Sequence, residues 1–360
     1  MSDLYNIALF VERGFEDSVI SELEKIVDKK LNINYFKLRK MSILIINKVK
    51  FEDVIKLSYV SRVLHDLLIL LGFDNMSKFN QILNNLEIPF EFSKIKIKLI
   101  KDNKKYGSNL SKQIYKKIRL FSKENNCELF FKGYIIDKKL VFGISLSKSI
   151  GKRGYKVFSH NNSINPVSIS TFLNYIKIPE EDILVIYSKD GTIPIEIGII
   201  SKNIPANFWS KKDFYILDDL SYLIKLDELF IRKSKIKIYS VDNFSRNIVI
   251  SKRNAVNAMV KDITFFKKAN IKYLDLILEK KFSTILIDFY KEKNLNIKEI
   301  LYSTKNLIKD DGKILIISNK DLTNSINFIS KKLSLEVVDI KDSIFLNEIK
   351  RFYILRKNNF

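Results

Sequence analysis

The sequence contains one cysteine, Cys127, and two histidines, His65 and His160. A single cysteine cannot form an intrachain disulfide, and such cysteine usage is typical of a reducing compartment. The three residues are also too few for a conventional zinc site, whose ligands are mostly Cys and His. We therefore expect no disulfide framework, no metal, a cytoplasmic location and a buried, unreactive Cys127.

Long apolar runs are also missing. No uninterrupted hydrophobic stretch approaches the roughly 20 residues that a membrane-spanning helix needs. The first residues, Met1-Ser2-Asp3-Leu4, lack the basic region and apolar stretch of a signal peptide. We expect no membrane association. The length of 360 residues, 46% of them hydrophobic, predicts about two to three globular domains.

The net charge of +22 is unevenly distributed along the chain. Residues 83–160 hold 18 basic and 6 acidic side chains, whereas residues 1–82 hold 12 and 11. A general abundance of lysine would spread the excess evenly. A basic domain of this kind is the electrostatic signature of a protein that binds the phosphate backbone of a nucleic acid.

The first 82 residues predict the order strand, helix, two strands, helix. The predicted elements are a strand at 4–11, a helix at 17–27, a hairpin of 35–40 and 43–47, and a helix at 51–71. This order begins a ferredoxin-like α+β domain. We expect His65, inside the last helix, to be a surface or capping residue.

Residues 83–160 predict a second α+β domain with a basic surface. Lys94–Ile100 alternates basic and apolar residues, as does a strand with one open face. A helix at 108–123 carries basic residues on its polar side. The candidate RNA-binding residues are Lys112, Lys116, Lys117, Arg119, Lys152 and Arg153. A single basic helix face is usually only solvated, but here a strand and a loop add to it.

Residues 161–360 alternate strands and helices, which is typical of a Rossmann-like, mostly parallel sheet. Asn165-Pro166 predicts a helix start, and 335–340 with 349–355 predict a hairpin at the sheet edge. A strand at 183–187 leads through Ser188-Lys189-Asp190-Gly191 into a helix. This layout presents backbone N–H groups to a nucleotide-like ligand, although the turn has one glycine where such loops usually have two or three.

The chain resembles the THUMP-domain RNA methyltransferases, in particular those that act on the exocyclic amine of a tRNA guanine. Gly14-Phe15-Glu16, Lys152-Arg153-Gly154-Tyr155 and Gly191-Thr192-Ile193-Pro194-Ile195-Glu196 carry the resemblance, with Lys237–Asp242 as a further match. It implies an N-terminal ferredoxin-like domain (1–82), a THUMP domain (83–160) and a Rossmann-like methyltransferase domain with a mixed seven-stranded sheet (161–360).

The resemblance also implies functional residues. Gly191, Thr192, Glu196, Asp242 and Asn270 are the cofactor candidates for S-adenosylmethionine, with Asp242 accepting hydrogen bonds from the ribose hydroxyls. Asp288 and Tyr290 fall where the family has its catalytic Asn-Pro-Pro-Tyr motif. There Asp288 could accept from the amine, and Tyr290 could stack on the base.

The chain departs from the family at the sites for cofactor and amine. Val185 and Lys189 stand where the family has the first Asp and the first Gly of its cofactor motif, and both prolines of the catalytic motif are absent. A lysine fills space that a backbone-built site leaves open. The sequence therefore predicts a tRNA-binding protein with a degenerate site, either a pseudoenzyme or a subunit with a protein partner. The alternative is an active S-adenosylmethionine-dependent tRNA guanine-N2 methyltransferase.

Overall fold

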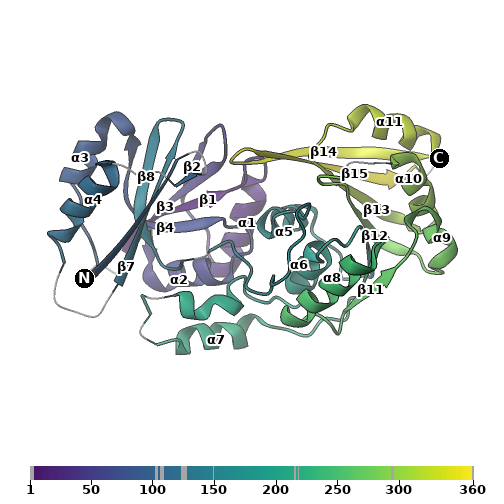
Figure 1. The fold of residues 1–360 in the computed structure, drawn as a ribbon, viewed down its shortest axis with the longest axis horizontal. Helices are drawn as coiled ribbons and strands as arrows, with labels where there is room; N and C mark the ends of the chain where they lie inside the picture. The colour runs from purple at the N-terminus through teal and green to yellow at the C-terminus, as the bar shows by residue number, and fades with distance from the viewer. Residues whose placement is uncertain are drawn as a thin grey trace. The chain divides into compact units, whose positions relative to one another are not determined.

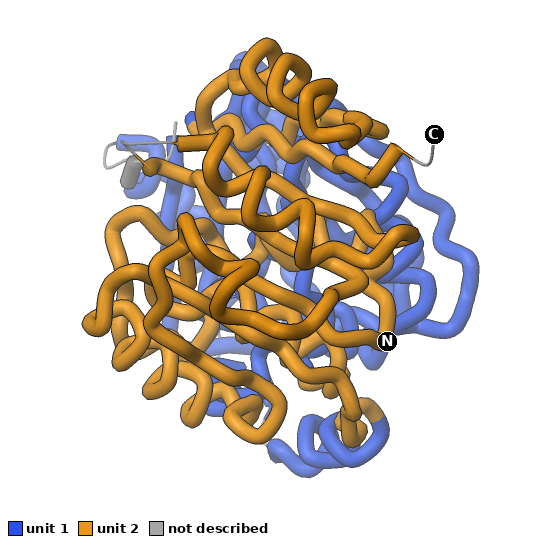
Figure 2. The backbone as a smooth tube through the Cα atoms, turned by 90° about the vertical axis from the view of Figure 1, so that its right-hand side faces the viewer, with its two compact units in different colours: residues 1–152, 205–229, 345–347 blue, residues 153–204, 230–344, 348–360 orange. Residues whose placement is uncertain are grey.

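The structure is a computed structural model that describes residues 4–101, 104–105, 109–122, 128–148, 150–214, 216–217, 219–292 and 296–358. The chain forms two compact units. Unit 1 comprises residues 1–152, 205–229 and 345–347, and unit 2 comprises residues 153–204, 230–344 and 348–360 (Figure 2).

Unit 1 is built on an eight-stranded sheet with the order β2-β3-β1-β4-β8-β7-β5-β6 (Figure 1). Its elements begin with β1 (Leu4–Val11), α1 (Glu16–Val27), β2 (Ile33–Lys37), β3 (Ser42–Lys50), α2 (Phe51–Val60) and β4 (Asp66–Asn75). They continue with η1 (Met76–Lys78), α3 (Phe79–Asn84), β5 (Lys94–Lys101), β6 (Lys104–Lys105), α4 (Asn109–Arg119), β7 (Glu128–Ile136) and β8 (Lys139–Ser145). Later in the chain, η2 (Phe208–Asp213) and most of α7 (Ser221–Phe230) return to this unit.

The first part of unit 1 has the βαββα order that the sequence predicts, and it is followed by a strand, β4, that the sequence analysis assigns to the last helix. The helix expected over 51–71 ends at Val60, because Ser61 adopts an extended backbone. β4 then pairs with β1 on one side and β8 on the other. A strand between two neighbours is a continuous apolar run, which periodicity alone cannot distinguish from a buried helix. His65 is therefore not in a helix, and its side chain is buried 3.3 Å from Glu12 Oε1.

The boundary expected at residue 82 does not divide the sheet. Ile69 on β4 lies opposite Ile144 on β8, so residues 1–82 and 83–145 share one continuous sheet. The break between the compact units falls between Lys152 and Arg153 instead of after residue 160. The two α+β segments that the sequence suggests therefore form one unit.

Unit 2 has a seven-stranded sheet with the order β11-β10-β9-β12-β13-β15-β14, which is the mixed sheet expected. Its first elements are α5 (Pro166–Ile176), β9 (Ile183–Ile186), α6 (Thr192–Ser201), β10 (Ile238–Asp242), α8 (Ser245–Asn257), β11 (Thr264–Lys268), η3 (Ile271–Tyr273) and α9 (Leu274–Ile277). The rest are β12 (Phe282–Asp288), α10 (Ile297–Lys305), β13 (Ile308–Ser318), α11 (Thr323–Lys332), β14 (Leu335–Phe345) and β15 (Glu348–Lys357).

The first five strands of this sheet pair in parallel, and β15 is antiparallel to β13. Helices α5, α6 and α8 cover one face and α9, α10 and α11 cover the other (Figure 1). The helix start at Asn165-Pro166 is confirmed, because the Asn165 side chain accepts from the backbone N–H of Val167 at 2.8 Å. Within the described ranges, no helix is long and apolar enough to cross a membrane.

Candidate functional site

The carboxyl ends of three neighbouring strands meet at one edge of the unit 2 sheet. β9 pairs in parallel with β10 on one side and β12 on the other. β9 leads into the turn that ends at Gly191, β10 ends at Asp242, and β12 ends at Asp288. Ligands of open α/β sheets bind outside such carboxyl ends. The structure thus brings three of the predicted site residues together.

The turn after β9 has an irregular backbone. Tyr187, Lys189 and Gly191 all have positive φ, at 68°, 52° and 82°. A Cβ atom on Gly191 would stand 3.0 Å from Cα of Ser251, so α8 packs directly against this glycine. Lys189 adopts a conformation that glycine takes at lower cost. The turn therefore has the shape of a glycine-rich loop but carries a long side chain.

The Lys189 side chain occupies the site instead of turning away from it. It is 2% exposed, and Nζ lies 2.6 Å from the carbonyl oxygen of Tyr290 and 3.1 Å from Oδ1 of Asp288. Oε1 of Glu292 is 3.5 Å away. The ammonium of the β9 turn therefore bridges to the end of β12, across the edge where the three strands meet.

Asp242 is fully engaged by the protein. Its Oδ1 accepts from the backbone N–H of Phe244 at 2.9 Å and from the Asn247 amide at 3.0 Å. Its Oδ2 accepts from the backbone N–H of Lys189 at 3.0 Å, and the residue is 1% exposed. The carboxylate expected to receive ribose hydroxyls thus holds the turn after β9 and the start of α8.

Asp288 and Tyr290 are both buried. Burial raises the pKa of Asp288 to about 6, although the Lys189 ammonium and the N–H of Tyr290 oppose the rise. Tyr290 is 1% exposed. In this structure the ring lies in the interior, and its stacking on an incoming base stays a prediction.

Glu196 and Arg153 are paired with each other. Glu196, on α6, is buried and accepts from Nε of Arg153 at 3.1 Å, from the Tyr155 hydroxyl at 2.8 Å and from Ser170 Oγ at 2.5 Å. Arg153 is 6% exposed. The roles of Arg153 in RNA binding and of Glu196 in cofactor binding stay predictions. The pair anchors the start of unit 2 to α5 and α6.

Thr192 and Asn270 make local hydrogen bonds. The N–H and hydroxyl of Thr192 both donate to Oδ1 of Asp190, at 3.2 and 2.7 Å. Asn270 is exposed, and its Oδ1 accepts from the backbone N–H of Lys272 at the start of η3. Neither side chain reaches the Lys189–Asp288 pair through any hydrogen bond that the described residues make.

Asp190 is a residue whose role the sequence does not reveal. It is 1% exposed, and its Oδ2 lies 2.9 Å from Nζ of Lys156 and accepts from the N–H of His160. Burial disfavours the charged form, but the nearby Lys156 ammonium and the hydrogen bond from Thr192 help to outweigh burial and lower the pKa of Asp190. The segment from Lys156 to Ser163 therefore closes over the turn after β9.

The other predicted RNA contacts lie on unit 1. On α4, Lys112, Lys116 and Arg119 are exposed and Lys117 is half-buried, whereas Ile114 and Ile118 are buried. Arg119 also lines a hollow of about 520 Å³ beside Lys94 and Lys96 of β5. Lys152 is exposed after β8. Cys127 lies outside the described residues.

Comparisons with known proteins agree with this architecture. Residues 153–290 match the UPF0020 family, described as an RMKL-like methyltransferase domain. A tRNA (guanine(6)-N2)-methyltransferase of Methanocaldococcus jannaschii is 27% identical over 222 residues, 57% of this chain and 58% of that protein. The enzyme of the same name from Archaeoglobus fulgidus is 24% identical over 150 residues, 41% of this chain and 36% of that protein. The chain therefore aligns with less than two thirds of either relative.

Solved structures show the same fold over the full length. SMU.472 complexed with SAH has a TM-score of 0.77 at 15% identity and covers 100% of both chains. TrmN from Thermus thermophilus has a TM-score of 0.66 at 11% identity and covers 98% of this chain and 99% of its own. Residues 153–290 thus match a UPF0020, RMKL-like methyltransferase domain, and the chain is similar over part of its length to two tRNA (guanine(6)-N2)-methyltransferases.

Proposed function

We propose that this protein binds tRNA or another structured RNA and that its methyltransferase-type site does not transfer methyl groups. It would serve in tRNA modification as a pseudoenzyme or as the subunit of a protein partner, in the cytoplasm. The observation that carries the proposal is the Lys189 ammonium, which is 2% exposed and paired with Asp288 at 3.1 Å. The chain itself fills the edge where the three strands end.

The residues at this edge do not fit S-adenosylmethionine. The cofactor carries a positive sulfonium, and Lys189 places a second, buried positive charge at the turn that the resemblance assigns to the cofactor. The carboxylate of Asp242, assigned to the ribose, already accepts from three protein donors.

Calorimetric titration with S-adenosylmethionine at low salt, with and without bulk tRNA, tests this part. We expect no saturable heat from a protein that still shifts tRNA in a gel. S-adenosylhomocysteine has a neutral sulfur, so its titration distinguishes two reasons for weak binding. If it binds and S-adenosylmethionine does not, the cause is charge repulsion; if neither binds, the Lys189 side chain fills the space. Lys189→Gly should bind either ligand better than the matched control Lys291→Gly, since Lys291 also has a positive φ but is exposed. One-to-one binding by the unaltered protein would refute the proposal.

A second candidate is an active tRNA guanine-N2 methyltransferase. The names of the two archaeal relatives and the position of Asp288 at the end of β12 favour it. This function requires the Lys189 side chain to leave the site, so that Asp288 can accept from an amine. A labelled-methyl transfer assay decides between the two functions: incorporation into tRNA that Asp288→Ala abolishes establishes the enzyme.

The RNA-binding part rests on α4. We expect charge reversal at Lys112, Lys116 and Arg119 to abolish tRNA binding at physiological salt. The slope of the logarithm of the binding constant against the logarithm of the salt concentration should become shallower by about 0.7–0.9 for each phosphate that the protein no longer neutralises. A control with the same change in net charge reverses three exposed lysines of unit 2: Lys298, Lys331 and Lys332. Equal weakening in both variants would mean that only the total charge matters.

A further inference from the structure

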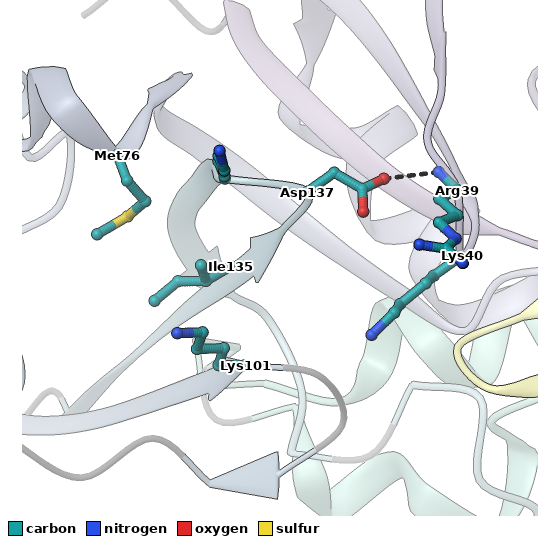
Figure 3. A pocket seen from close by; sticks show the side chains of 7 residues that line it. Arg39, Lys40, Met76, Lys101, Ile135 and Asp137 are labelled. Carbon is teal, nitrogen blue, oxygen red and sulfur yellow. Dashed lines mark hydrogen bonds between the residues drawn. The ribbon is translucent and has the colours of Figure 1, made fainter.

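A second basic feature of unit 1 lies away from α4. A pocket of about 450 Å³ opens where the β2–β3 turn, the β7–β8 turn, the end of β5 and the start of η1 converge. Figure 3 shows Met76 on one side of it, Arg39 and Lys40 on the other, and Ile135 and Lys101 between them. Lys138 and Asp137 complete the lining. None of the RNA-binding candidates on α4 contributes to it.

The lining carries a strong excess of positive charge. Arg39, Lys40, Lys101 and Lys138 contribute four cations, and Asp137 is the one acid among the lining residues. The Asp137 carboxylate is already engaged, because its Oδ2 accepts from the backbone N–H of Arg39 at 2.6 Å. Four basic side chains around one small volume create a positive potential that attracts anions. The lining of the pocket therefore favours an anionic ligand.

The walls of the pocket are held by one hydrogen bond from a backbone N–H to a side chain and by two hydrogen bonds within the backbone. The Asp137–Arg39 bond joins the β7–β8 turn to the β2–β3 turn. The N–H of Met76 donates to the carbonyl oxygen of Lys138 at 2.8 Å, which joins the start of η1 to the same β7–β8 turn. The β2–β3 turn is closed by the N–H of Leu38 donating to Met41. Such a preformed site loses little conformational entropy when a ligand binds.

The inner wall of the pocket is apolar. Ile135 is 6% exposed, and Met76 lies beside it in the lining. Inorganic phosphate or sulfate would leave this surface uncovered, whereas a nucleobase would cover it, and methionine sulfur makes favourable contacts with aromatic rings. A volume of about 450 Å³ is in the usual range for a nucleotide-sized ligand.

We propose that this pocket binds a nucleoside phosphate, with the phosphate among Arg39, Lys40, Lys101 and Lys138 and the base against Ile135 and Met76. The ligand is either a free nucleotide or a nucleotide of an RNA strand, since both present the same chemistry. The proposal does not depend on RNA binding by α4 or on the state of the Lys189 site.

The test uses the full chain and adenosine 5′-monophosphate in calorimetry at low salt. We expect one-to-one binding, with adenosine and inorganic phosphate each binding at least tenfold more weakly. Lys40→Gln/Lys101→Gln should weaken the nucleotide at least tenfold. The matched control Lys25→Gln/Lys50→Gln changes two lysines of unit 1 that do not line the pocket, and it should leave the affinity unchanged. Equal thermal stability of the two double variants shows that the fold is intact.

The same variants with tRNA distinguish the two sources of the ligand. Loss of nucleotide affinity without loss of tRNA affinity identifies a free nucleotide. A tenfold loss of tRNA affinity in Lys40→Gln/Lys101→Gln, absent from the control, identifies an RNA strand, even if the free nucleotide binds too weakly to measure. The proposal is overturned if the pocket variant and the control behave alike towards both ligands.

Discussion

Replacing Lys189 with methionine tests whether the Lys189–Asp288 pair occupies the site as an ion pair. Methionine keeps most of the side-chain volume but removes the ammonium that lies 3.1 Å from Asp288 Oδ1. Asp288 then loses the charge and the hydrogen bond that oppose the effect of burial, so its pKa in the folded protein rises above about 6. The variant should therefore depend on pH differently from the unaltered protein.

The sign of this effect follows from proton linkage. The pKa of Asp288 is about 6 in the folded protein and near 3.8 when unfolded, so its contribution to stability is largest below pH 3.8 and is lost as the pH rises through 6. In Lys189→Met this loss continues above pH 6, by about 1.4 kcal/mol for each pH unit up to the new pKa. Between pH 5 and pH 8 the variant should lose up to about 3 kcal/mol relative to the unaltered protein.

Urea unfolding from pH 5 to pH 8 measures this difference in four proteins: unaltered, Lys189→Met, Asp288→Asn and the double variant. The pH dependence caused by Lys189→Met should disappear in the Asp288→Asn background, because no titrating carboxyl remains beside it. The control Lys291→Met removes an exposed neighbour and should change stability by less than about 0.5 kcal/mol at every pH. The reasoning fails if the effect of Lys189→Met is independent of pH, or if it persists without Asp288.

Three further predictions concern the surroundings of the site and the pocket. Gly191→Ala should lower the free energy of unfolding by about 2–3 kcal/mol, because φ is 82° and the new Cβ would lie 3.0 Å from Ser251. Urea denaturation measures this free energy, and an unchanged value would contradict the close approach of α8 to the turn. Tyr155→Phe should lower the free energy of unfolding by about 1–2 kcal/mol, because it removes the hydroxyl that donates to buried Glu196 at 2.8 Å. A decrease below about 0.5 kcal/mol in urea denaturation would show that the remaining hydrogen bonds to Glu196 compensate for this loss. Asp137→Ala removes the acceptor of the Arg39 backbone N–H, so the rate of amide hydrogen exchange at residue 39 should rise at least tenfold. An unchanged exchange rate would show that other contacts hold the β2–β3 turn.

The sequence predicts most of unit 2 because its local signals and its fold agree. Asn165 and Pro166 start α5 as expected, and the alternation of strands and helices gives the mixed seven-stranded sheet. The sequence analysis assigns no strand to the residues of β11, Thr264–Lys268. A five-residue strand at a sheet edge gains its identity from pairing with β10, and no local pattern reports that pairing.

The candidate site is predicted less completely than the fold. The ends of β9, β10 and β12 place Gly191, Asp242 and Asp288 together, as strand order alone requires. The spacing of residues in the sequence does not determine the direction of a long side chain. The contact between Lys189 and Asp288 is therefore visible only in the structure. Arg153 and Glu196 are 43 positions apart, so the sequence gives no sign that they pair with each other. The sequence analysis therefore assigns Arg153 to RNA binding and Glu196 to cofactor binding.

The two unusual residues of the turn after β9 are both buried, and each is paired with a residue of opposite charge. Lys189 pairs with Asp288, and Asp190 pairs with Lys156 from the segment that covers the turn. Removing one member of a buried pair leaves an uncompensated charge, which typically costs about 3–5 kcal/mol. Lys189→Gly alone would therefore open the turn but leave Asp288 without its partner. The filled site is therefore a stable arrangement of the fold, and Lys189→Gly can open it only with a loss of stability.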